Sequence, residues 1–122
     1  MNFTVAGWGA TESAPTSDVL LDSNLNYTLN AECERKFRQR VFQFRLLPSQ
    51  MCAQGVHLES NSCVVDSGGP LMMSRNLKNG FQIMGVSSFG NARCQSLTPG
   101  VFTRVSNYLK FIKDYVFDNA II

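Results

Sequence analysis

The chain has 122 residues, of which 44% are hydrophobic and 16% are charged. This balance excludes an intrinsically disordered protein and suits one small globular domain or a piece of a larger one. The formal net charge of +2 is too small to indicate a nucleic-acid partner. No apolar run approaches the ~18 residues that a membrane-spanning helix requires. We therefore expect neither nucleic acid nor membrane among the partners.

The first half of the chain carries two strand patterns and one short helix pattern. Residues 3–8 predict a short strand. Apolar residues at positions 19, 21, 25 and 27 alternate with polar residues at 22, 24 and 26, which predicts a half-buried strand. Asn30 has a side chain suited to capping a helix N-terminus, so a short helix is predicted over residues 31–37.

The second half carries further strand patterns and ends in a helix. Strands are predicted over residues 51–53, 70–73, 81–89 and 101–105. Asn79-Gly80 is a strong turn signal for a hairpin between two of them. Ser106 is the predicted N-cap of a final helix over residues 106–118, and we expect one face of that helix to pack on the rest of the domain. The apolar positions of this face are Tyr108, Leu109, Phe111, Ile112, Tyr115 and Val116.

Taken in order, these elements predict an all-β fold. An antiparallel unit over residues 1–105 would be followed by the C-terminal helix. A small barrel is the expected closure, because a closed barrel leaves no sheet edge unpaired.

The four cysteines are Cys33, Cys52, Cys63 and Cys94, and no two of them form a C-x-x-C pair. Zinc sites usually contain such a close pair, so we expect no metal. An even count in a small domain favours two disulfides formed in an oxidising compartment, over the alternative of four reduced cysteines in a cytosolic protein. The residues alone leave three pairings open.

The N-terminal segment has neither the basic start nor the apolar stretch of a signal peptide. Two N-x-[ST] glycosylation sequons, at Asn2 and Asn26, nevertheless fit secretion. A disulfide-containing chain without an export signal suggests that the start of a longer precursor is missing. The alternative is a leaderless protein whose cysteines stay reduced.

The segment 61–70 concentrates the residues that could carry chemistry. Ser67 stands beside Asp66 and is followed by two glycines, which makes it a candidate nucleophile that still needs a base. Val65 breaks the G-x-S-x-G pattern of α/β-hydrolases. On these residues alone, a Gly-Gly-Pro turn after a disulfide is the favoured interpretation.

Several segments, in the correct order, resemble the chymotrypsin/trypsin family of serine endopeptidases (peptidase S1). Residues 66–71 (DSGGPL) resemble the active-serine motif of that family. Further likenesses are residues 5–9 (VAGWG), 51–53 (MCA), 88–90 (SFG) and 98–105 (TPGVFTRV). The resemblance covers nearly the whole chain, and it extends to the arthropod clip-domain branch, which acts in secreted cascades.

The resemblance implies the C-terminal six-stranded antiparallel barrel of a trypsin-like fold, over residues 1–105, with the C-terminal helix 106–118 and without the first barrel. It implies the disulfides Cys33–Cys52 and Cys63–Cys94. Ser67 matches the nucleophile, and Asp66 matches the acid that pairs with the new N-terminus after zymogen cleavage. The substrate-pocket positions are Asn61, Ser62, Ser88, Phe89, Gly90 and Gly100. No cofactor is implied.

Three positions depart from the family pattern. His57 is the single histidine and matches no motif that carries the catalytic base, which in this family comes from the first barrel. Val65 stands where the family has the glycine whose N–H contributes to the oxyanion hole, and a β-branched residue tolerates positive φ poorly. Asn61 stands where trypsin-like members carry a pocket-floor aspartate, so specificity for Arg or Lys is not expected.

These observations support two main hypotheses and a remote third. The first is the C-terminal half of a secreted serine endopeptidase that acts on protein or peptide substrates, with the first barrel of the same domain as its missing partner. The second is a non-catalytic protease homologue that serves as a binding module for extracellular cascade proteases. The third is an unrelated disulfide-stabilised β domain. The first two predict that this chain alone does not cleave peptides and that an uncovered apolar face promotes association.

A basic cluster near the predicted short helix has no role in this scheme. A solvated surface is the favoured interpretation, and a site for heparin-like chains is the alternative. The cluster comprises Arg35, Lys36, Arg38, Arg40 and Arg45.

Overall fold

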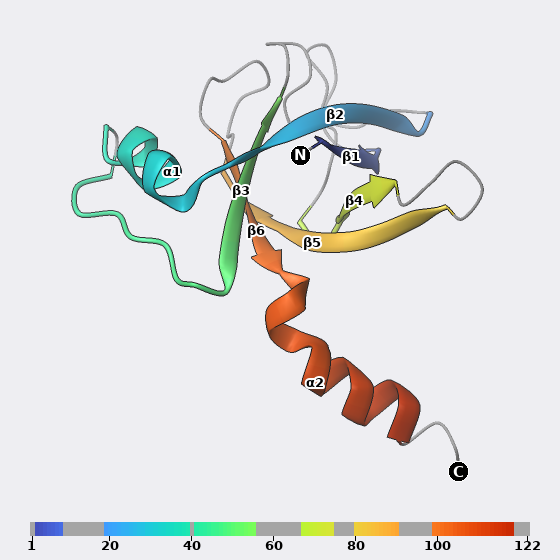
Figure 1. Ribbon diagram of the computed structural model, residues 1–122. Coiled ribbons are helices and arrows are strands. Elements are labelled where there is room, and N and C mark those ends of the chain that lie inside the picture. Colours follow the sequence, from blue (N-terminus) through green and yellow to red (C-terminus); the bar gives the residue numbers. More distant parts are fainter. Residues whose placement is uncertain are drawn as a thin grey trace.

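The computed structural model describes residues 2–8, 19–39, 41–55, 67–74, 80–90 and 99–118. Its strands are β1 (Asn2–Gly7), β2 (Leu21–Thr28), β3 (Gln50–Gly55), β4 (Pro70–Ser74), β5 (Phe81–Phe89) and β6 (Gly100–Arg104). They close into an antiparallel barrel in the order β1-β2-β3-β6-β5-β4, with β4 returning to β1 (Figure 1). This closure confirms the predicted six-stranded all-β barrel followed by a C-terminal helix.

The barrel interior is filled by side chains that alternate along the strands. In β2, Leu25 is buried while its neighbours Asn24 and Asn26 are exposed, as the alternating pattern predicted. Val19 lies before β2 and is exposed, so the strand begins two residues later than expected. Each large apolar side chain buried here contributes roughly 1.5–3 kcal/mol to stability. The core cluster comprises Phe3, Val5, Leu25, Met51, Ala53, Leu71 and Phe102.

Strands β4 and β5 form the expected hairpin, and their paired residues run from Pro70↔Val86 to Ser74↔Phe81. Residues 75–79, between the two strands, lie outside the described residues, so the predicted two-residue turn at Asn79-Gly80 is not tested. Asn79 lies outside the described residues, whereas Gly80 has a φ of +74°. The hairpin prediction is therefore confirmed at the level of the two strands.

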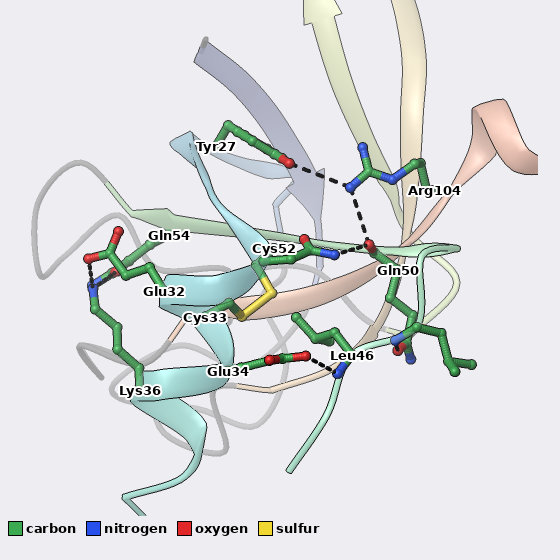
Figure 2. The surroundings of a disulfide bond; sticks show 12 residues. Tyr27, Glu32, Cys33, Glu34, Lys36, Leu46, Gln50, Cys52, Gln54 and Arg104 are labelled. Carbon is green, nitrogen blue, oxygen red and sulfur yellow. Dashed lines mark hydrogen bonds and ion pairs between the residues drawn. A yellow bond between two sulfur atoms is a disulfide. The ribbon is translucent and has the colours of Figure 1, made fainter.

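A disulfide between Cys33 and Cys52 joins helix α1 (Asn30–Phe37) to strand β3 (Figure 2). Both cysteines are fully buried, and they form a second core cluster with Phe37 and Val101. This bond confirms one of the two pairings that the family resemblance implied. Cys63 and Cys94, the other predicted pair, lie outside the described residues.

The prediction that Asn30 caps α1 is wrong. The cap position falls on Leu29, no side-chain cap hydrogen bond forms, and Asn30 is the first helical residue. The Asn30 amide instead donates to the backbone carbonyl of Gln50, at 3.1 Å. The Arg104 guanidinium donates to that same carbonyl, at 3.2 Å, so α1, β3 and β6 meet at one backbone oxygen (Figure 2).

The C-terminal helix runs from Val105 to Asp118 through a 3-10 turn (Val105–Tyr108), an α-helical turn α2 (Leu109–Ile112) and a π-helical turn (Lys113–Asp118). The prediction that Ser106 caps it is wrong, because Ser106 lies inside the first turn and the cap position falls on Arg104 without a side-chain cap bond. No helix among the described residues is both long and apolar enough to cross a membrane.

The expectation that this helix packs one apolar face on the barrel is also wrong. The helix extends away from the barrel (Figure 1). Five of the six predicted packing residues are exposed: Tyr108, Leu109, Phe111, Tyr115 and Val116.

Candidate active site

Ser67 lies on a short turn that leads into β4 and is fixed against β5. The N–H of Gly68 donates to the carbonyl of Ser87, and the N–H of Ser87 donates to the carbonyl of Gly69, both at 2.8 Å. These bonds continue the β4–β5 ladder beyond Pro70↔Val86. Gly68 adopts a φ of +90°, which an L side chain rarely tolerates. The turn therefore holds the exposed Ser67 side chain beside the C-terminal end of β5.

The Ser67 hydroxyl donates to the backbone carbonyl of Ser88, at 3.1 Å. Ser88 is the residue that the β5–β6 pairing skips, because Ser87 pairs with Phe102 and Phe89 pairs with Val101. Such β-bulges redirect the residue that they contain and occur often beside active sites. The bulge is thus the feature that makes the carbonyl of Ser88 available to Ser67.

Gly90 allows residues 88–90 to approach the start of β6. Its φ is +132°, and a Cβ there would lie 2.8 Å from Gly100 Cα and 3.0 Å from the Pro99 carbonyl oxygen. Only glycine fits this position without a shift of the backbone. We call Ser88, Phe89 and Gly90 the 88–90 wall.

The structure therefore gathers five of the predicted site residues in one place. Ser67 contacts the 88–90 wall through Ser88, and the wall contacts Gly100 through Gly90. The other predicted catalytic, oxyanion-hole and pocket residues lie outside the described part of the chain. These are Asn61, Ser62, Val65 and Asp66, together with His57.

Phe89 is supported by two aromatic residues that the sequence did not single out. Its ring packs edge-to-face on Phe37 at the end of α1 and on Phe44, each with a centroid distance of 6.2 Å. Phe37 and Phe44 stack on each other, with centroids 4.6 Å apart. The sequence offered only a weak signal for Phe44, because it lies in an irregular segment without a strand or helix period.

Among the described residues, the hydrogen-bond partner of the Ser67 hydroxyl is the Ser88 carbonyl. A serine hydroxyl needs a neighbouring base to become a strong nucleophile, and the one histidine of the chain, His57, lies outside the described residues. No group of three or more His, Cys, Asp or Glu residues in the described ranges could hold a metal ion. The site presents the exposed hydroxyl of Ser67 in a fixed position beside the 88–90 wall.

The sequence model described as "Trypsin" matches residues 1–112, which include Ser67, the whole 88–90 wall and every strand of the barrel. The chain belongs to the trypsin family. Among trypsin-family relatives, Melanization protease 1 of Drosophila melanogaster is 38% identical over 115 residues, which are 92% of this chain and 28% of that protein. Spaetzle-processing enzyme of the same species is 39% identical over 112 residues, or 89% of this chain and 27% of that protein.

A solved trypsin-family structure, titled as the Drosophila Grass clip serine protease of the Toll pathway, matches with a TM-score of 0.72 and 31% identity. The match covers 99% of this chain and 34% of that one. The expected trypsin-like fold and the expected likeness to clip-domain proteases are both confirmed. The chain spans about a third or less of the length of these relatives.

Proposed function

We propose that this chain is the C-terminal part of the protease domain of a secreted serine endopeptidase, with Ser67 as the nucleophile. The observation that supports the proposal is the placement of Ser67, an exposed hydroxyl on a turn that two backbone hydrogen bonds fix beside the 88–90 wall. Acyl transfer needs a nucleophile held in a fixed position relative to its substrate, and the turn supplies such a position for the hydroxyl.

In this mechanism, Ser67 Oγ attacks the carbonyl carbon of the scissile peptide while a base accepts the hydroxyl proton. The base then passes the proton to the leaving amine, and water releases the acyl group by the same steps. Since the hydroxyl donates to Ser88 among the described residues, it has to rotate away from that carbonyl to donate to a base. We propose that this base comes from the first barrel of the same trypsin-like domain.

The first barrel is also the proposed partner of the exposed C-terminal helix. A hollow of about 370 Å³ beside the first turns of the helix is lined largely by apolar side chains, among them Phe3, Ile83 and Leu109. Leu109 belongs both to this hollow and to the exposed apolar helix surface, so the two are continuous. Exposed apolar surfaces of this kind mark interaction sites. The relatives have more than enough polypeptide beyond the matched region to cover it.

An extracellular location and a protein substrate complete the proposal. The Cys33–Cys52 disulfide is typical of a protein that folds in an oxidising compartment. The names of two relatives, Spaetzle-processing enzyme and Melanization protease 1, describe proteases with roles in processing or melanization. We infer that the protein containing this chain acts in an extracellular protease cascade of the same kind.

Refolding the chain together with the first-barrel part of its own precursor tests this function. We expect the mixture to hydrolyse peptide p-nitroanilides, the chain alone to be inactive, and Ser67→Ala to abolish the activity of the mixture. Ser74→Ala removes another exposed hydroxyl, on β4, and should leave the rate unchanged. Hydrolysis that survives Ser67→Ala, or hydrolysis by the chain alone that requires Ser67, contradicts the proposal.

A non-catalytic binding module is the second candidate, and the substitution at Val65 favours it. A valine at the oxyanion-hole position removes the conformational freedom that the family's glycine supplies, and loss of one such donor costs about 10²–10³ in turnover. A fluorophosphonate probe separates the two candidates. Labelling of Ser67 in the refolded mixture supports the enzyme, whereas a folded mixture that stays unlabelled supports the binding module.

A further inference from the structure

The segment between α1 and β3 forms a hollow on the surface, away from the barrel interior. The hollow has a volume of about 760 Å³ and is lined by Arg38, Phe42, Gln43 and Arg45. We call these four residues the basic hollow. It contains neither Ser67 nor any residue of the 88–90 wall, so it is a surface distinct from the candidate active site.

Hydrogen bonds made by the side chains of Glu34 and Arg38 fix the segment that forms the basic hollow. One carboxylate oxygen of Glu34 accepts the N–H of Leu46 at 2.8 Å, and the other accepts a guanidinium N–H of Arg38 at 3.3 Å. The Nε of Arg38 in turn donates to the Phe44 carbonyl at 3.0 Å. The segment is therefore tied to α1 at two successive points, and it does not need to become ordered when a partner binds.

Backbone strain and an exposed aromatic side chain coincide in the same hollow. Gln43 has a φ of +60°, and a non-glycine residue in this region costs of the order of 1–3 kcal/mol, a cost that recurs at ligand-binding segments. On the two sides of Gln43, Phe44 turns inward to stack on Phe37, whereas Phe42 is 87% exposed. Next to the strained residue Gln43, the Phe42 ring is therefore exposed to solvent in a hollow that Arg38 and Arg45 also line.

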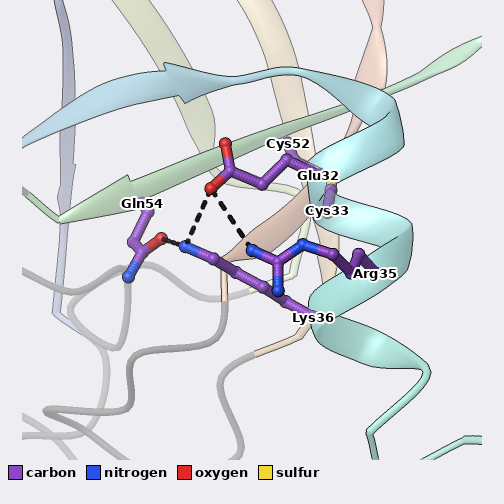
Figure 3. A network of polar contacts seen from close by, with 6 residues as sticks. All are labelled: Glu32, Cys33, Arg35, Lys36, Cys52 and Gln54. Carbon is purple, nitrogen blue, oxygen red and sulfur yellow. Dashed lines mark hydrogen bonds and ion pairs between the residues drawn. A yellow bond between two sulfur atoms is a disulfide. The ribbon is translucent and has the colours of Figure 1, made fainter.

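The charges near the hollow determine what kind of anion fits it. On α1, one carboxylate oxygen of Glu32 forms ion pairs with a guanidinium nitrogen of Arg35 and with Nζ of Lys36, each at 3.7 Å (Figure 3). The Nζ of Lys36 also donates to the side-chain oxygen of Gln54. Arg45, by contrast, makes no ion pair within the described ranges. On α1, Glu32 offsets part of the positive charge of Arg35 and Lys36, which weakens the field that a sulfated glycan would meet there. The unpaired positive charge is that of Arg45, which lines the same hollow as Phe42.

We propose that the basic hollow is a docking site for an acidic segment of a protein partner, one that places an apolar side chain next to a carboxylate. The carboxylate pairs with Arg45, because a guanidinium group binds a carboxylate with two parallel hydrogen bonds. Arg38 already pairs with Glu34, so it lines the hollow without being the main partner of the carboxylate. The apolar side chain packs on Phe42, since aromatic residues and arginine are the types enriched where proteins contact each other. Binding at this surface does not depend on whether Ser67 is catalytic.

The test measures binding of a fluorescent hexapeptide, Asp-Glu-Leu-Asp-Glu-Phe, to the full-length protein by fluorescence anisotropy. We expect Arg45→Ala and Phe42→Ala each to weaken binding by about tenfold, the scale typical of residues at the centre of an interface. Arg35→Ala is the matched control for charge, because it removes one positive charge from a residue that pairs with Glu32. Phe81→Ala is the matched control for an exposed ring, because Phe81 lies on β5 and is 57% exposed. Both controls should keep the wild-type affinity.

Four results would overturn the proposal. The first is the absence of peptide binding at millimolar concentration. The second is an equal loss of affinity in Arg35→Ala and Arg45→Ala, which would indicate a diffuse positive field. The third is a heparin hexasaccharide that binds more tightly than the peptide and is insensitive to Phe42→Ala, which would assign the surface to a glycan. The fourth concerns a peptide in which Ser replaces Leu and Phe. It should bind about tenfold more weakly, and equal binding would mean that no apolar side chain packs on Phe42.

Discussion

Ser67 Oγ and the carbonyl oxygen of Ser88 lie 3.1 Å apart, and the hydroxyl donates to the carbonyl. The pairing of β5 with β6 skips Ser88, so one hydrogen bond connects the proposed nucleophile to the bulge in the proposed pocket wall. A change that straightens the bulge would therefore alter both the wall and the orientation of the hydroxyl.

Gly90→Ala should destabilise the fold and distort the wall. The added Cβ meets Gly100 Cα at 2.8 Å, and both sides of this contact are constrained by β5 and β6. We expect a loss of about 2–4 kcal/mol, from positive-φ strain together with the clash. Gly80→Ala is the control, because Gly80 also has positive φ but nothing within 4 Å of its Cβ position, so urea denaturation should show a loss of about 1 kcal/mol. Equal losses would show that the close approach at Gly90 costs nothing.

Removal of the disulfide by the double change Cys33→Ala and Cys52→Ala should lower the free energy of unfolding by about 3 kcal/mol. The two cysteines are 19 positions apart, and closing a loop of this length restricts the unfolded chain by that amount. Denaturation of the oxidised wild type and the double variant measures the difference. An unchanged midpoint would mean that the link between α1 and β3 is sustained by packing alone.

Phe44→Ala should cost more stability than Phe42→Ala, although the two residues are neighbours on one segment. Phe44 is half-buried between Phe37 and Phe89, and we expect a loss of about 2–3 kcal/mol on its removal. Phe42 is exposed, so its removal should change the unfolding free energy by less than about 0.5 kcal/mol. Chemical denaturation of both variants tests this ranking, and the reverse order would contradict the inward orientation of Phe44.

Glu34→Ala should be more destabilising than Glu34→Gln. Alanine leaves the half-buried N–H of Leu46 without its acceptor, at a cost of about 1–2 kcal/mol. Glutamine retains an oxygen for Leu46 and loses only the ion pair with Arg38, which is worth about 0.3–0.5 kcal/mol at a partly exposed site. Thermal unfolding of the two variants gives the comparison. Equal effects would mean that the ion pair, and not the bond to Leu46, stabilises the segment.

Leu109→Ser and Val116→Ser should reduce self-association of the chain. Both side chains are exposed on the C-terminal helix, at 59% and 51%, and apolar surface of this extent favours contact with another surface. Sedimentation velocity of the chain measures the association, and Asn107→Ser, on the same helix, is the control. Association that both apolar changes leave intact would place the contact elsewhere.

The strands could be predicted from the sequence because alternation reports which side of a sheet a residue faces. Leu25 between Asn24 and Asn26 is an example, and its burial needs no knowledge of the partner strand. The two caps could not be predicted in the same way. Asn30 and Ser106 have side chains suited to an N-cap, but each helix starts at or before that residue, and Asn30 bonds to Gln50 far along the chain instead.

The C-terminal helix shows a second limit of pattern analysis. Helical periodicity identifies an apolar face, yet it carries no information about what that face contacts. The pairing of Cys33 with Cys52 came from the family resemblance, since the residues alone left three pairings open. Phe44 was missed because its support of Phe89 depends on the path of an irregular segment.

The carbonyl oxygen of Gln50 accepts hydrogen bonds from both Asn30 and Arg104. Since this acceptor belongs to the main chain, any amino acid at position 50 supplies it, while the two donors exist only in the side chains at positions 30 and 104. For these two hydrogen bonds, substitutions at position 50 should therefore be tolerated, whereas substitutions at positions 30 and 104 should destabilise the junction of α1, β3 and β6. In a mutational scan, position 50, which makes two of the bonds at this junction, would tolerate more substitutions than positions 30 and 104, which make one each.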